Sequence, residues 1–373
     1  MTTDAVGLYI HIPFCRSKCR YCDFASYGGK TGADIDLYID ALASEIKGYK
    51  REERIRAKTV YLGGGTPSLL SPSQLLCILD ALRESFDIEE GAEVTLEANP
   101  GTVSADTLAA YHALGVNRLS LGLQSIHENE LKFLGRIHSY EDFLSSYTAA
   151  REVGFDNISV DLMYGIPEQT EASFEETLRS VIALSPEHLS VYGLILEEGT
   201  PFFDIKASLP LPDEDAEYRM YLLAIEMLGK AGYSHYEISN YAKAGYRAEH
   251  NSIYWKDGEY IGVGCAAYSY FEGERYGNPR SLEAYLRGDL RCEVEAVDRA
   301  AHRFEYAMLA LRLKEGIDLG EYERLFGRSF TDGIEDRLDR FISMGLMTMA
   351  EGRLAFTDRG FYLSNSVMAD IVR

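Results

Sequence analysis

The sequence is poor in cysteine, in tryptophan and in long apolar runs, and each shortage excludes a class of protein. Six cysteines and one tryptophan occur among its 373 residues. Six cysteines, only three of them clustered, are too few for a disulfide-stabilised secreted fold. We expect no membrane-spanning helix, because no apolar run reaches the roughly 18 residues that one needs. The N-terminus also lacks the basic and apolar regions of a secretory signal, so we expect a cytoplasmic protein.

Basic residues are in short supply as well. Lysine and arginine total 37 against 59 aspartate and glutamate residues, which gives a net charge of −22. A protein that binds the nucleic-acid backbone needs a basic surface, and so does one that adheres to anionic lipid. We therefore expect no nucleic-acid partner. The hydrophobic content of 46% and the charged content of 26% are those of an ordinary globular protein.

What the chain does have is a cysteine cluster near its start. Cys15, Cys19 and Cys22 are spaced C-x3-C-x2-C, and thiolates bind zinc, copper(I) or iron–sulfur clusters. A structural zinc site needs a fourth protein ligand, which no nearby Cys or His supplies; a distant fourth ligand stays an alternative. Three thiolates on a four-iron cluster would instead leave one iron open. We expect the isolated cysteines to be small buried residues; they are Cys77, Cys265 and Cys292.

The first half of the chain alternates strand-like and helix-like segments. We predict strands at 7–14, 59–63, 93–98, 118–123, 158–164 and 189–194. We predict helices at 35–49, 72–85, 105–114, 140–153 and 174–184. Consecutive βα units predict an α/β fold with a parallel sheet and right-handed crossovers. Six units are fewer than the eight of a closed barrel, so we expect an open, partial (β/α)6 barrel.

The alternation ends near residue 200. Short strands are predicted at 233–241, 260–262 and 268–272, and helices at 215–230, 300–313, 319–326 and 334–344. A β-hairpin that turns at Glu351-Gly352 and a terminal helix follow. We therefore expect a core over residues 1–235, an α+β extension over 236–297 and a small winged-helix-like domain over 298–373.

Polar residues stand where the predicted strands end. Parallel βα folds place their sites at the carboxyl ends of strands. A glycine run, Gly63-Gly-Gly-Thr66, follows the second strand, and Asp161 lies inside an apolar run, where a carboxylate needs a partner. Each such residue taken alone could be a cap, a tight turn or a surface charge. As a set at successive strand ends they predict a binding site, and the others are Glu97, Gln124 and Arg136.

On these residues the chain resembles the radical S-adenosylmethionine (SAM) proteins of the oxygen-independent coproporphyrinogen III oxidase-like group, over essentially its whole length. The cysteine spacing after Tyr9-Ile-His-Ile-Pro-Phe carries the resemblance. It implies that the three cysteines hold a [4Fe–4S] cluster whose open iron binds SAM. A SAM carboxylate suits a guanidinium, and ribose hydroxyls suit a carboxylate. The implied SAM positions are Tyr9, Gly64, Gly65, Thr66, Glu97, Gln124, Arg136 and Asp161.

Two details distinguish the chain from the oxidases of that group. The oxidases resemble C-x3-C-x2-C-x-C, whereas the position of the last cysteine is Phe24 here. The run His250-Asn-Ser-Ile-Tyr-Trp255 matches the H-N-x-x-Y-W motif of the HemW-type heme chaperones. That resemblance implies binding of heme and its transfer to apo-hemoproteins, such as membrane-associated respiratory cytochromes, and a homodimer is among its expectations. A neutral imidazole is a competent axial ligand of heme iron, so His250 is the candidate heme residue.

Three alternatives remain at this point. The motif could be structural, with His250 and Asn251 ordering a loop while Tyr254 and Trp255 fill the interface with the C-terminal domain. The protein could be an oxidase, in which SAM is cleaved to a radical that starts decarboxylation of coproporphyrinogen III. It could also carry out radical chemistry on heme itself. We assign no ligand role to His11, which we expect to be a core or cluster-side residue.

Overall fold

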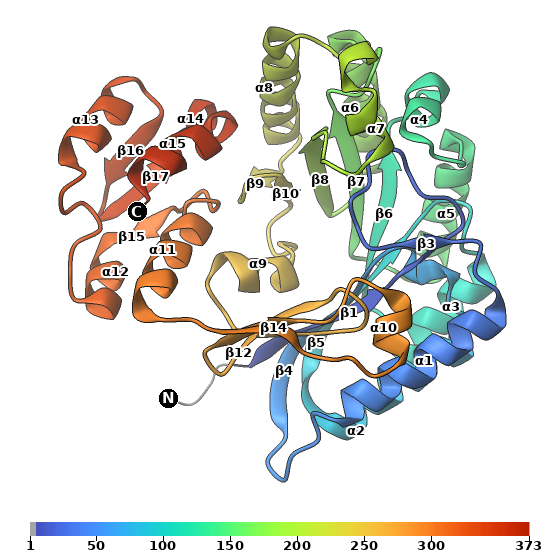
Figure 1. Ribbon diagram of the computed structural model, residues 1–373. Coiled ribbons are helices and arrows are strands. Elements are labelled where there is room, and N and C mark those ends of the chain that lie inside the picture. Colours follow the sequence, from blue (N-terminus) through green and yellow to red (C-terminus); the bar gives the residue numbers. More distant parts are fainter. Residues whose placement is uncertain (1–4, 373) are drawn as a thin grey trace.

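A large open sheet organises the protein. The computed structural model describes residues 5–372. The sheet has 12 strands in the order β14-β13-β12-β11-β1-β4-β5-β6-β7-β8-β10-β9. Its central strands run parallel to one another, as predicted. They are β1 (Val6–Ile12), β4 (Ile55–Gly64), β5 (Phe86–Ala98), β6 (Arg118–Gln124), β7 (Ile158–Tyr164) and β8 (His188–Gly193). The strands do not close on themselves, and this confirms the open (β/α)6 arrangement (Figure 1).

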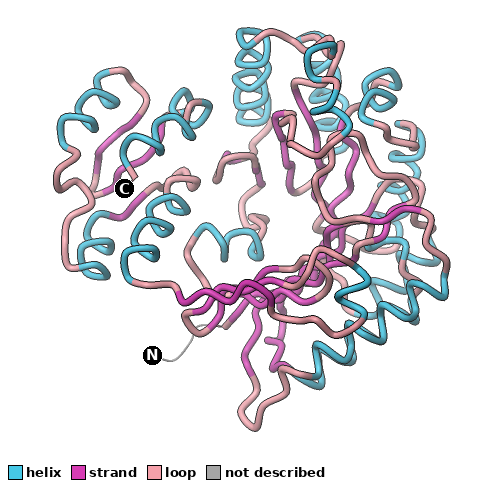
Figure 2. The backbone as a smooth tube through the Cα atoms, in the orientation of Figure 1, coloured by secondary structure: helices cyan, strands magenta, loops and turns pink. Residues whose placement is uncertain are grey.

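Helices follow the central strands and cover the outer side of the sheet (Figure 2). Helix α2 shows why the sequence forms them: Ser71 and Gln74 make a reciprocal capping box, and Pro72 occupies the first turn. The helices are α1 (Gly32–Lys47), α2 (Pro72–Ser85), α3 (Ala105–Leu114), α4 (Glu128–Leu134), α5 (Tyr140–Glu152) and α6 (Glu171–Leu184). A short 3-10 helix, η1, spans Pro67–Leu69.

The side chains of strand β1 alternate between the apolar core and the opposite face of the sheet. Leu8, Ile10 and Ile12 are at most 1% exposed and join the apolar core that the outer helices share. Burial of one such side chain contributes about 1.5–3 kcal/mol. Tyr9 and His11 occupy the alternate positions and therefore point to the opposite face of the sheet.

The middle of the chain extends both edges of this sheet. After α7 (Pro201–Asp204), η2 (Lys206–Ser208) and α8 (Glu214–Lys230), β10 (Asn240–Ala242) pairs antiparallel with β8, and β9 (Ser234–His235) pairs with β10. The chain then crosses to the other edge, where β11 (Tyr260–Val263) runs parallel to β1. The remaining elements are α9 (Glu249–Trp255), β12 (Tyr268–Phe271), β13 (Glu274–Gly277), α10 (Leu282–Leu286) and β14 (Cys292–Ala296).

The C-terminal segment has a small sheet of its own, seen in orange and red in Figure 1. The predicted hairpin is present, and both turn residues, Glu351 and Gly352, have positive φ. Its elements are α11 (Arg299–Ala310), β15 (Ile317–Asp318), α12 (Leu319–Phe326), α13 (Glu335–Ser343), β16 (Met347–Ala350), β17 (Arg353–Phe356), α14 (Asp358–Tyr362) and α15 (Ser364–Ile371). Within residues 5–372, no helix is long and apolar enough to cross a membrane.

Candidate cofactor site

A cavity of about 330 Å³ opens at the carboxyl ends of the central strands. It collects predicted residues from four central strands, β4 to β7, from the loop after α4 and from the cysteine loop, which are far apart in the sequence. Two predicted residues, Tyr9 and His250, do not line it. The predicted residues that do are Cys15, Cys19, Cys22, Gly64, Gly65, Thr66, Glu97, Gln124, Arg136 and Asp161.

The cysteine loop lies between two short strands, β2 (Phe14–Cys15) and β3 (Tyr27–Gly28), which pair in parallel. The Cys22 amide donates to the Cys19 carbonyl at 3.3 Å, so these two residues share one turn. All three thiols are free and partly exposed toward the cavity. In the described part of the chain, no three Cys, His, Asp or Glu side chains are arranged to hold a single metal ion.

The isolated cysteines behave in different ways. Cys265 is buried, as predicted. Cys77 is exposed on helix α2, so the expectation of a buried residue was wrong there, because position 77 falls on the solvent face of an amphipathic helix. Cys292 is partly exposed, between these two cases.

The glycine turn after β4 brings the backbone close to its neighbours. Gly64 has a φ of 107°, and an added Cβ there would lie 2.4 Å from the ring of His11. A Cβ on Gly65 would lie 2.7 Å from the carbonyls of Ile12 and Phe14. Neither position tolerates a side chain. The turn therefore offers bare backbone to the cavity, as a ligand ammonium or carboxylate would require.

Glu97 ties this turn to the neighbouring strands. Its carboxylate accepts the Tyr61 hydroxyl at 2.7 Å and the Gly64 amide at 3.0 Å. Burial raises the pKa of Glu97 to about 7. Glu97 lines the cavity and at the same time fixes the shape of the glycine turn.

The carboxylate of Asp161 has a hydrogen-bond partner, as its apolar sequence context led us to expect. The Ser120 hydroxyl lies 3.0 and 3.1 Å from the two carboxylate oxygens and donates to them. Burial nonetheless raises the pKa of this carboxyl above its ordinary value. The neighbouring strand carries an irregularity in its pairing at Gly122 and Gln124, and Gln124 has a φ of 70°. The irregularity re-aims the Gln124 side chain into the cavity at the cost of backbone strain.

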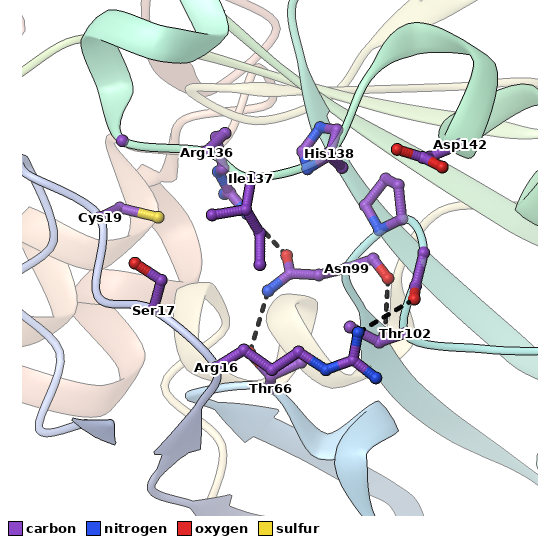
Figure 3. A pocket seen from close by; sticks show the side chains of 13 residues that line it. Arg16, Ser17, Cys19, Thr66, Asn99, Thr102, Arg136, Ile137, His138 and Asp142 are labelled. Atoms are coloured by element: carbon purple, nitrogen blue, oxygen red, sulfur yellow. Dashed lines mark hydrogen bonds between the residues drawn. The ribbon is translucent and has the colours of Figure 1, made fainter. Parts of the chain in front are cut away.

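Arg136 reaches the cavity from the loop after α4. Its guanidinium donates to Asn99 Oδ1 at 2.6 Å and to the Tyr21 hydroxyl at 2.8 Å. Asn99 in turn donates to Thr66 at 2.9 Å. Figure 3 shows Arg136, Asn99 and Thr66 around a second hollow of about 210 Å³, which shares these three residues with the first. The buried Arg136 Nε lacks a hydrogen-bond partner within residues 5–372.

Asn99, Tyr21 and Ser120 were not among the predicted site residues. Asn99 follows the third central strand directly, so its place at a strand end was the available signal. Tyr21 lies between Cys19 and Cys22, and this position within the cysteine cluster could have indicated that it belongs to the site.

Tyr9 lies beside the predicted SAM site and lines a different cavity. Its hydroxyl hydrogen-bonds His11 Nδ1 at 2.9 Å, and its ring stacks on those of Tyr61 and His250. His11 Nε2 lies 2.9 Å from the Ala25 carbonyl, and burial lowers the pKa of this imidazole. Both nitrogens of His11 have protein partners, as expected for a core residue.

His250 lies on helix α9 and is 1% exposed. Its ring nitrogens pair with Thr59 Oγ1 and with the Tyr254 hydroxyl, each at 2.7 Å. Burial lowers the pKa of His250 to about 3, so the imidazole is neutral. To bind iron, the imidazole would exchange one of these two hydrogen bonds for the metal.

The rest of the motif has structural contacts of its own. The Arg312 guanidinium, from beyond helix α11, lies 5.5 Å from the Trp255 ring centre. This cation–π contact links the motif to the C-terminal segment. The motif therefore has part of the structural role that we kept as an alternative.

The residues of the cavity fit a [4Fe–4S] cluster and SAM. Three free thiols offer the three thiolates that such a cluster takes from one loop. The unpartnered Nε of Arg136 offers a donor for a carboxylate, and the bare glycine turn offers close backbone approach.

Comparisons with known proteins agree with this fit. The radical SAM superfamily model matches residues 9–181, and the HemN C-terminal domain model matches residues 297–363. Heme chaperone HemW of Escherichia coli is 37% identical, over 97% of this chain and 97% of its own. Heme chaperone HemW of Lactococcus lactis is 36% identical, over 96% of this chain and 95% of its own.

The solved structure of coproporphyrinogen III oxidase (HemN) from Escherichia coli, a radical SAM enzyme, has the same fold. Its TM-score is 0.86, and the match covers 99% of this chain and 90% of that one at 24% identity. Membership of the radical SAM family implies a [4Fe–4S] cluster and SAM. The chain belongs to the HemW family of radical SAM proteins.

Proposed function

We propose that the protein is a heme chaperone, which binds heme and passes it to apo-hemoproteins such as membrane-associated respiratory cytochromes. It carries a [4Fe–4S] cluster on Cys15, Cys19 and Cys22 and binds SAM. The observation that carries the proposal is the H-N-x-x-Y-W motif on α9, together with full-length similarity to proteins named heme chaperones. Phe24, which stands where the oxidases have a further cysteine, supports it.

The SAM site in this proposal follows from the cavity chemistry. Arg136 binds the SAM carboxylate with its Nε donor, which has no hydrogen-bond partner within residues 5–372. The turn at Gly64 and Gly65 lies against the SAM amino-acid end, and Asp161 accepts the ribose hydroxyls. Thr66, Glu97 and Gln124 complete the wall, while Tyr9 supports it from behind His11. Cys15, Cys19 and Cys22 would hold the cluster, and in its reduced state it could supply one electron to SAM.

In this proposal His250 takes part in heme binding as a member of the H-N-x-x-Y-W motif. It holds the hydroxyl of Tyr254 and so positions that side chain. Direct ligation of iron by His250 is the second form of the same proposal, and the spectrum of a His250 variant separates the two forms.

We further propose that the protein acts in the cytoplasm, can form a homodimer, and has no nucleic-acid partner. Its units would be the core over 1–235, the extension over 236–297 and the C-terminal domain over 298–373. The net charge of −22 supports delivery through a specific protein partner, because this charge repels an anionic lipid surface.

The test is titration of the anaerobically reconstituted protein with heme, followed by addition of an apo-cytochrome. A saturable Soret change, followed by transfer of heme to the apo-protein, supports the chaperone. Absence of either step contradicts it.

One observation favours a second candidate, oxygen-independent coproporphyrinogen III oxidase. Every predicted SAM residue except Tyr9 lines one cavity, and Asp161 there is paired with Ser120. An anaerobic assay with coproporphyrinogen III and a reductant distinguishes the two functions. Sustained formation of protoporphyrinogen IX would replace the chaperone proposal with the enzyme.

A further inference from the structure

A second cavity, of about 310 Å³, adjoins the cysteine loop and shares only Phe24 with the lining of the SAM cavity. Its walls are rich in aromatic side chains and come from β1, the cysteine loop, α9, β11 and β12. The lining residues are Tyr9, His11, Asp23, Phe24, Ala25, Tyr254, Tyr260, Ala266, Tyr268 and Arg280.

The two sequence features that depart from the oxidase pattern meet in this cavity. Phe24 comes from the cysteine loop, and Tyr254 comes from the H-N-x-x-Y-W motif on α9, far away in the chain. Phe24 is 64% exposed. Tyr268 is 47% exposed on the same cavity. Exposed aromatic faces beside a hollow are suited to a flat apolar ligand.

The charges of the cavity fit an anionic edge on such a ligand. The Arg280 side chain is 63% exposed and donates to the Asp23 carbonyl at 2.9 Å. Its nearest contact with the Asp23 carboxylate is 3.5 Å, which is a weak ion pair. Within the described residues only Nη2 of Arg280 donates hydrogen bonds, both to Asp23, so other guanidinium donors are open to a carboxylate in bidentate fashion.

We propose that heme binds in this cavity, with its macrocycle against Phe24 and Tyr268 and a propionate paired with Arg280. The inference rests on the proposed heme-binding function and adds the location of the heme site. Tyr254 forms part of the wall, and His250 holds the Tyr254 hydroxyl from the buried side. The open shape of the cavity leaves one edge of the macrocycle outside, which suits a carrier that must release heme to a partner.

The wall between the two cavities lets heme and SAM bind together. His11 lies against Gly64 of the SAM turn and lines the aromatic cavity with its neighbour Tyr9. Phe24 is shared, because it lines both cavities. SAM and heme would therefore be close neighbours with separate binding sites.

The test is titration of the Phe24→Ala and Arg280→Gln variants with heme. The Soret band reports heme binding, and SAM affinity is measured in parallel. Loss of one aromatic contact weakens heme binding about 2- to 10-fold. Loss of one exposed charge pair weakens it up to about 5-fold. Arg280→Gln binds SAM as the wild type does, because Arg280 does not line the SAM cavity. Iron content and thermal melting verify that each variant is loaded and folded.

Matched controls lie away from the cavity. Phe304→Ala removes a 41%-exposed phenylalanine of α11, and Arg51→Gln breaks an exposed pair with Glu272. Both controls should bind heme with wild-type affinity. If the wild type binds heme and both cavity variants bind it equally well, heme lies elsewhere and this inference is wrong. If the wild type itself does not bind heme, the proposed function fails instead.

Discussion

The imidazole of His11 lies directly against Gly64, so that a Cβ at position 64 would fall 2.4 Å from the ring. His11 cannot move aside easily, because Tyr9 and the Ala25 carbonyl hold its two nitrogens. The shape of the predicted SAM turn is thus fixed by a histidine of the neighbouring strand.

Gly64→Ala should therefore weaken SAM binding by about tenfold or more and lower the melting temperature by a few degrees. The substitution combines a clash with a left-handed backbone that costs an L-residue about 1–2 kcal/mol. Gly91→Ala is the control, since its φ is also positive at 80° but nothing lies within 4 Å of its added Cβ. Isothermal titration with SAM tests this, and wild-type affinity in Gly64→Ala would remove the turn from the site.

Arg136→Lys should weaken SAM binding by about 10- to 100-fold, the value of a hydrogen bond to a charged group. Lysine keeps the charge but lacks the planar fork, in which Nη1 and Nη2 hold Asn99 and Tyr21 while Nε is left for a carboxylate. Arg83→Lys on the exposed face of α2 should have no effect. Equal SAM affinity in the two variants would show that Arg136 does not bind the ligand.

His250→Gln should lower the melting temperature, because it removes a buried group with two hydrogen bonds, worth about 1–3 kcal/mol when left unmatched. We expect weaker heme binding with an unchanged Soret position, since His250 reaches the ligand through Tyr254. Thr59→Val, which removes the other partner, is the matched variant. A shifted Soret band in His250→Gln alone would identify the imidazole as the iron ligand.

Glu237 should make stability depend on pH. This side chain is 1% exposed, and burial raises its pKa from an ordinary 4.5 to about 7, although Arg312 and Asn240 oppose the rise. The folded protein then holds a proton that the unfolded chain releases above pH 4.5. Stability should fall by about 3 kcal/mol as pH rises from roughly 4.5 to 7, and change little above.

Glu237→Gln should remove this fall. Urea midpoints at pH 5 and pH 8 give the measurement. If the urea midpoint changes between pH 5 and pH 8 by the same amount in the wild type and the variant, Glu237 does not cause the loss of stability.

Much of the core followed from the sequence because its signals are local. The predicted helix at 72–85 has the predicted bounds, since Ser71, Gln74 and Pro72 specify its start within four residues. The predicted site residues of the central strands, apart from Tyr9, met in one cavity because parallel strands end at the same edge.

The elements that escaped prediction depend on distant partners. Helix α9 carries the motif, but its buried His250 depends in part on two distant residues of β4, Thr59 and Tyr61. The parallel pairing of β11 with β1 joins a strand of the extension to the first strand of the core, about 250 residues apart, and no local pattern reveals it. Tyr9 faces a different cavity from the one expected, because the wall formed by His11 and Gly64 is visible only in three dimensions.

The most direct test of the chaperone proposal is heme transfer from the reconstituted protein, run beside an anaerobic coproporphyrinogen III assay on the same preparation. The proposed function predicts stoichiometric heme binding, its passage to an apo-cytochrome, and no accumulation of protoporphyrinogen IX. Sustained formation of protoporphyrinogen IX without heme transfer would contradict it.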